Sequence, residues 1–131
     1  MRPLLLLFMA TVLLGYQGKK APQLKPPALD VVETTAHRDQ GGLLAIDGKL
    51  KNTGERSAEK LVIIVDVLDS DKRAITTQKG SSEPESIEAG EQGEFHAQMR
   101  LPARAVYIRL SFEDGDGREV KATNVGPFAI E

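Results

Sequence analysis

The chain of 131 residues holds two histidines, His37 and His96, and no cysteine. The lack of cysteine excludes disulfides, thiolate zinc sites, iron–sulfur ligation and cysteine nucleophiles. His96 and Met99 form an H-x-x-M pair, whose side chains would both suit copper. In a β-strand, however, residues three apart point to opposite faces, so we expect an exposed His96 and a core Met99. The sequence therefore predicts no metal site at the histidines and no cofactor.

Serine is the other candidate nucleophile. The serines fall mainly where turns are expected, at Ser57, Ser70, Ser81 and Ser82. The chain has neither a G-x-S-x-G elbow nor a G-x-x-x-x-G-K phosphate loop. A hydrolase would need a pocket that gathers one of the histidines with a serine and a carboxylate, and strand parity argues against such a pocket. We therefore expect a protein that is not an enzyme and has no catalytic residues.

The carboxylates in the segment EDGDG at 113–117 allow two interpretations. Oxygen ligands beside glycines are typical of calcium sites, and Glu113, Asp114 and Asp116 would be the ligands. A full EF-hand loop would need a further ligand at alternate spacing and a terminal bidentate Glu, and both are missing. Asp-Gly is also the strongest short signal for a hairpin turn, because glycine accepts positive φ at little cost. The similar bend DSDK at 69–72 has no glycine, which favours a turn in both places, with calcium as the alternative.

Aromatic residues are too few for a convincing stacking surface. Tryptophan is absent, and alternation assigns Phe95 and Phe112 to the core, which leaves Tyr107 and Phe128. Glycan binding is therefore, with calcium binding, an alternative function rather than the preferred one. Nucleic acid is excluded as a partner, because the net charge is -2 and base stacking meets the same shortage of aromatic rings.

Turn-forming residues recur at short intervals from Leu29 onward, and no stretch keeps a 3.6-residue period. We expect one all-β domain over 29–131, an immunoglobulin-like, fibronectin III-like antiparallel β-sandwich of about seven strands. The expected strands are 31–38, 43–52, 60–69, 74–79, 93–101, 105–113 and 118–123.

Alternation in two neighbouring strands is the main evidence for this fold. Apolar side chains occupy every second position in 95–101 and 106–112, so each strand should have one buried and one wet face. The run at 61–65 is apolar throughout, and its β-branched residues favour a strand over a buried helix. The weakly apolar stretch 76–91 is expected to be a mobile edge or loop. The predicted core positions are Leu44, Ile46, Leu50, Leu61, Ile63, Val65, Val67, Phe95, Ala97, Met99, Leu101, Val106, Ile108, Leu110 and Phe112.

The N-terminus has the pattern of an export signal. Arg2 precedes an apolar run that extends to Gly15, too short for a membrane span but typical of a secretory signal peptide over 1–15. The run ends in L-L-G-Y, which is similar to a lipoprotein lipobox with Tyr16 in the place of the lipid-bearing cysteine. Cleavage and lipid anchoring both stay open. Prolines and lysines predict an extended linker over 16–28, and the mature chain should have no transmembrane span.

A set of turn and core positions between Gly48 and Glu119 forms a spaced pattern. It consists of G-x-x-x-N-x-G at 48–54, V-D-V-L-D at 65–69, A-G-E at 89–91 and Phe95. This pattern resembles bacterial envelope domains of the FxLYD and related immunoglobulin-like type. The motif that names the family differs, because V-x-V-L stands where Phe, Leu and Tyr are expected. The resemblance implies a fold and an envelope setting but no activity.

These features together predict an exported, noncatalytic protein-interaction or structural module of the bacterial cell envelope, periplasmic or at the cell surface. Its partner would be another protein of the envelope. Exposed sheet edges would accept a partner strand by β-augmentation, unless charges such as Lys79 and Glu83 block the pairing. The identity of the partner and the oligomeric state do not follow from the sequence.

Overall fold

The computed structural model describes residues 23–131, which form eight β-strands and no helix. The signal peptide expected over 1–15 and the first part of the linker expected over 16–28 lie outside these residues. Seven strands match the expected ones to within a few residues, and the sequence pattern does not predict the short eighth strand. This part of the chain therefore contains no helix that could cross a membrane. The strands are β1 (Ala28–Arg38), β2 (Leu43–Asn52), β3 (Val62–Leu68), β4 (Ala74–Glu83), β5 (Gln92–Arg100), β6 (Tyr107–Glu113), β7 (Glu119–Thr123) and β8 (Phe128–Ala129).

The strands form one sheet that closes on itself. Its order is β3-β4-β5-β2-β1-β7-β6, and β3 pairs again with β6, so seven strands make a closed β-barrel while β8 lies against β6. The expectation of an immunoglobulin-like sandwich is therefore wrong. A sandwich keeps two separate sheets, whereas here two short pairings join the walls. They are the parallel pairing of β1 with β7 at residues 28–30 and the antiparallel pairing of β4 with β5 at residues 81–83.

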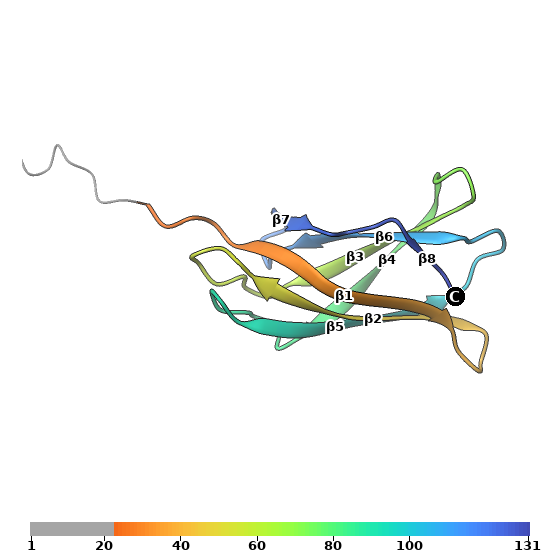
Figure 1. Cartoon of the computed structure of the whole chain (residues 1–131), viewed down its shortest axis with the longest axis horizontal. Coiled ribbons are helices and arrows are strands. Elements are labelled where there is room, and N and C mark those ends of the chain that lie inside the picture. Colours follow the sequence, from red (N-terminus) through yellow and green to blue (C-terminus); the bar gives the residue numbers. More distant parts are fainter. Residues whose placement is uncertain (1–22) are drawn as a thin grey trace, which may run out of the picture.

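β4 is one of the strands that link the two walls (Figure 1). It pairs with β3 along residues 74–81 and ends beside β5, where residues 81–83 pair with 94–96. The expectation of a mobile edge or loop over 76–91 is wrong at residues 81–83, where the strand has a partner, whereas residues 74–80 do form an edge on the side away from β3. Nor is the stretch outside the core, because Ser82 and Ile87 are buried. The β4 residues opposite the core positions of β3 are Thr76, Gln78 and Gly80, so no apolar alternation marks the strand.

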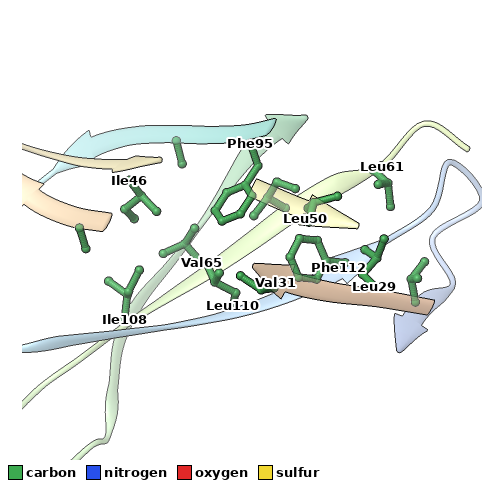
Figure 2. Close-up of a cluster of buried hydrophobic side chains, with 14 of the residues drawn as sticks. Leu29, Val31, Ile46, Leu50, Leu61, Val65, Phe95, Ile108, Leu110 and Phe112 are labelled. Carbon is green, nitrogen blue, oxygen red and sulfur yellow. The ribbon is translucent and has the colours of Figure 1, made fainter. Parts of the chain in front are cut away.

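The interior of the barrel holds the apolar rows that the alternation predicts (Figure 2). Side chains of β2 and β5 point toward those of β3 and β6 and fill the space between the walls. The rings of Phe95 and Phe112 meet edge to face with their centroids 6.2 Å apart. Such a contact contributes about 0.5–1.5 kcal/mol beyond the burial of the rings. Every predicted core position is buried except Leu101 and Val106, which lie just outside their strands and are partly buried.

The spaced pattern at 48–54 has a structural explanation. A Cβ on Gly48 would lie 2.3 Å from Cζ of Phe95, so a side chain at this point of β2 would collide with the ring. Asn52 is fully buried, and its Nδ2 donates hydrogen bonds to the carbonyl oxygens of Arg56 and Ile87 at 2.8 and 2.9 Å. These residues hold one end of the barrel together.

Candidate functional site

β4 and β5 diverge beyond their short pairing, so along one stretch of the barrel wall the two strands face each other without strand pairing. We call this stretch the seam: residues 74–80 of β4 on one side and residues 97–100 of β5 on the other. On its far side each strand is paired, β4 with β3 and β5 with β2. Among the residues that the structure describes, no strand pairs with the sides that face the seam. The seam is therefore bordered by two sheet edges whose backbone N–H and C=O groups lack strand partners.

The two edges of the seam differ in their side chains. On β4, Gln78 is exposed although it lies opposite Val65, which is completely buried. On β5, the inward side chains are Ala97 and Met99, each 6% exposed. The inward side of the β4 edge is therefore polar and partly open to solvent, whereas that of the β5 edge is apolar and buried.

A serine, a histidine and a carboxylate come together where the seam closes. The Oγ of Ser81 lies 3.5 Å from Nε2 of His96, and Asp47 is the partner of His96 on β2. Strand parity describes one strand at a time, whereas the register between β4, β5 and β2 brings these three residues side by side. All three side chains are exposed, and no hydrogen bond among the described residues joins Asp47 to His96.

The surroundings of Ser81, His96 and Asp47 do not resemble a hydrolase site. A triad needs its base oriented by the carboxylate and its nucleophile beside a substrate pocket. A hollow of about 160 Å³ beside His96 is lined by residues of β1, β2 and β5, and Ser81 is not among them. These three residues therefore form a polar group on the outer face of the sheet, at the closed end of the seam.

Three hairpins of the molecule share one turn design. Asp39, Asp69 and Asp114 each accept hydrogen bonds at Oδ1 from the backbone N–H groups two and four residues later, at 2.9–3.0 Å. The residue three after the aspartate has positive φ, which is 65° at Lys72 and 81° at Gly117. The prediction that the segments at 69–72 and 113–117 are turns of one kind is confirmed.

Two of these turns stabilise the charged carboxylate. The N–H of Leu43 is the main cause that lowers the pKa of Asp39, and the Gln98 amide, 2.9 Å away, acts in the same direction. The N–H of Arg73 is the main cause that lowers the pKa of Asp69. A carboxylate that accepts N–H donors is favoured in its ionised form.

The three candidate calcium ligands lie at the hairpin between β6 and β7. Two backbone N–H groups already occupy Oδ1 of Asp114, Glu113 lies in β6 opposite Glu119, and Asp116 is exposed. Between residues 23 and 131, no three His, Asp or Glu side chains are grouped so that they could hold a metal ion. The arrangement shapes a hairpin.

The two remaining aromatic residues do not share a surface. Tyr107 carries the Lys72 ammonium group 5.4 Å from its ring centroid. Phe128 lies opposite the buried Ile108 and packs against the core. Tyr107 directly precedes Ile108 in β6 and therefore faces the other way. His37, the second candidate imidazole, is exposed near the end of β1.

Sequence reasoning missed a cleft at the opposite end of the barrel from the β3–β4 hairpin. Its volume is about 490 Å³, and its lining includes Pro26, Lys60 and Asp114. Three basic and four acidic side chains line it, so their charges largely offset one another. Spacing in the sequence gives no signal for it, because its walls come from three separate loops.

Comparison with known proteins shows similarity to solved structures only. Neither a protein-family model nor a curated protein sequence matches the chain. Among solved structures, one similar chain is IrmA from Escherichia coli, with 14% sequence identity and a TM-score of 0.49. The similar region covers 83% of this chain and 99% of that chain. At this level of similarity the likeness carries no information about function.

Proposed function

We propose that the chain is an exported, noncatalytic interaction module of the bacterial cell envelope, which binds an extended segment of a partner protein as an added strand at the seam. The observation that carries the proposal is the pair of unpaired sheet edges between β4 and β5. Unpaired edges are the surfaces on which β-augmentation occurs, because the main-chain groups of both chains satisfy one another.

The β4 edge is long enough for such binding. Residues 74–80 equal or exceed the length of an ordinary strand, and each main-chain hydrogen bond contributes about 0.5–1.5 kcal/mol. Lys79 is the one charged residue in this stretch, and proline is absent from it. Glu83, the other charge that was expected to guard the edge, lies in the part already paired with β5. The edge thus has few of the features that usually prevent strand addition.

The open end of the seam lies away from the segment that precedes β1. Glu55 donates its backbone N–H to the carbonyl oxygen of Lys25 at 3.2 Å, and its Oε1 accepts the N–H of Lys25 at 2.8 Å. These bonds dock the segment before β1 at the end where β4 and β5 are joined. The strands diverge toward the opposite end, where the β3–β4 hairpin lies (Figure 1). A protein held by its N-terminus would present the open end of the seam outward.

Site-specific photo-crosslinking in the bacterium that exports the protein tests this proposal. A photoreactive amino acid at Gln78, on the seam, should give a discrete adduct that mass spectrometry maps to one short segment of one partner. The matched control carries the same group at Lys121, which is exposed on β7. Failure to obtain an adduct at Gln78, or the same adduct from Lys121, would overturn the proposal.

A further inference from the structure

The seam differs in charge from the rest of the described chain. All 19 acidic residues of the protein lie in residues 23–131, whereas three of the 17 basic residues (Arg2, Lys19 and Lys20) precede it, so this part has a formal charge of about -5. No acidic residue lies at 74–82 of β4 or at 95–100 of β5. Lys79 and Arg100 lie on these strands, and both are exposed. The seam is therefore a basic strip in an acidic body.

Two carboxylates that touch residues of the seam are occupied by hydrogen bonds to them. Asp66 of β3 accepts a hydrogen bond from Oγ1 of Thr77 at 2.7 Å. Asp39 accepts one from Gln98 at 2.9 Å, in addition to the backbone donors of its turn. No ion pair within residues 23–131 involves Lys79 or Arg100. Both cations are therefore free to meet charges on an incoming chain.

We infer that the segment bound at the seam is acidic, with carboxylates on its outward side and small or apolar residues on its inward side. This inference rests on the proposed function and adds the chemistry of the partner. Alternate residues of an added strand point to opposite faces of the sheet. The outward ones would lie between Lys79 and Arg100, and the inward ones would lie beside Met99 on the interior side of β5. Opposite charges on neighbouring strands stabilise the pairing, and like charges weaken it.

Synthetic peptides of ten residues provide the test, with the isotope-labelled protein purified from the envelope fraction. A peptide that alternates Glu and Val should slow amide hydrogen exchange at residues 74–80 or 97–100. A peptide that alternates Lys and Val should give at least tenfold weaker binding, which corresponds to about 1.4 kcal/mol. The Glu-Val peptide with a central proline should also fail, because proline removes a main-chain donor and disrupts the added strand.

Charge reversal on the protein gives the reciprocal test. The double variant Lys79→Glu, Arg100→Glu should no longer bind the Glu-Val peptide and should bind the Lys-Val peptide instead. The matched control Lys51→Glu, Lys121→Glu changes the net charge equally at exposed positions outside the seam and should leave the preference intact. Equal binding of both peptides would overturn the acidic preference and leave strand addition standing. Absence of protection by any peptide, with the Gln78 crosslink still formed in cells, would also overturn the acidic partner but not the proposed function.

Discussion

Gly80 of β4 lies directly against Ala97 of β5. A Cβ on Gly80 would be 2.7 Å from the Cβ of Ala97 and 2.6 Å from the carbonyl oxygen of His96. The pairing that closes this part of the barrel begins one residue later, where Ser81 is the partner of His96. Gly80 therefore marks the point at which the seam ends, and its lack of a side chain lets the two strands approach.

Replacing this glycine should loosen the closure. We expect Gly80→Ala to lower the free energy of unfolding by about 1–3 kcal/mol, because the new methyl group meets backbone as well as a side chain. Hydrogen exchange at residues 81–83 should become faster. The control Gly41→Ala introduces a methyl group with an ordinary 3.5 Å contact and should change the stability by less than about 0.5 kcal/mol. Equal effects of the two substitutions would show that the close approach is unimportant.

The buried Asn52 side chain should contribute strongly to stability. Asn52→Ala would leave the carbonyl oxygen of Arg56 and the N–H of Gly54 without the partners they now have at 2.8 and 2.9 Å, whereas the carbonyl oxygen of Ile87 would keep the N–H of Ala58. Each buried group left without a partner costs about 1–3 kcal/mol. We expect chemical denaturation to show a loss of about 2–5 kcal/mol, the upper part of that range applying if water reaches neither of the two unpaired groups. Lys51→Ala, one residue away and exposed, is the control and should be nearly neutral.

The aspartate turns predict a loss of stability in acid. The folded-state pKa values of Asp39 and Asp69 lie below the ordinary value of an aspartate, so each turn contributes stability that is fully present above about pH 4. This contribution should disappear as the pH falls through the lowered pKa values. Thermal melts between pH 2 and 6 should show the decline, and it should be smaller in the double variant Asp39→Asn, Asp69→Asn. An unchanged decline in that variant would assign the acid sensitivity to other carboxylates.

The barrel could be predicted from the sequence only in part, and β4 shows why. The buried rows of β5 and β6 could be predicted because every second residue is apolar. The row starts at Phe95 in β5 and at Ile108 in β6. The inward row of β4 is Thr76, Gln78, Gly80 and Ser82, which has the composition of a loop. Closure depends on two three-residue pairings, and no periodicity in the sequence records such short contacts.

Among the site residues, too, local features could be predicted from the sequence and contacts between strands could not. The turns in the segments 69–72 and 113–117 were predictable because their geometry is local and an aspartate, Asp69 or Asp114, accepts the hydrogen bonds that form each of them. The approach of Ser81 to His96 was not, because it depends on the register of β4 against β5. The seam itself could not be predicted either, since it consists of a pairing that stops early. Spacing within a strand carries no information about where its neighbour diverges.

The hairpin at 113–117 should not respond to calcium. Asp114 uses Oδ1 to accept the N–H groups of Asp116 and Arg118, at 2.9 and 3.0 Å, so calcium ligation would compete with the bonds that form the turn. A thermal melt in millimolar calcium should therefore match a melt in chelator. A ligand present at 100 times its Kd would add about 2.7 kcal/mol, an increase that such a comparison detects easily. If calcium raised the melting temperature and Asp116→Asn removed the rise, the turn would be a cation site after all.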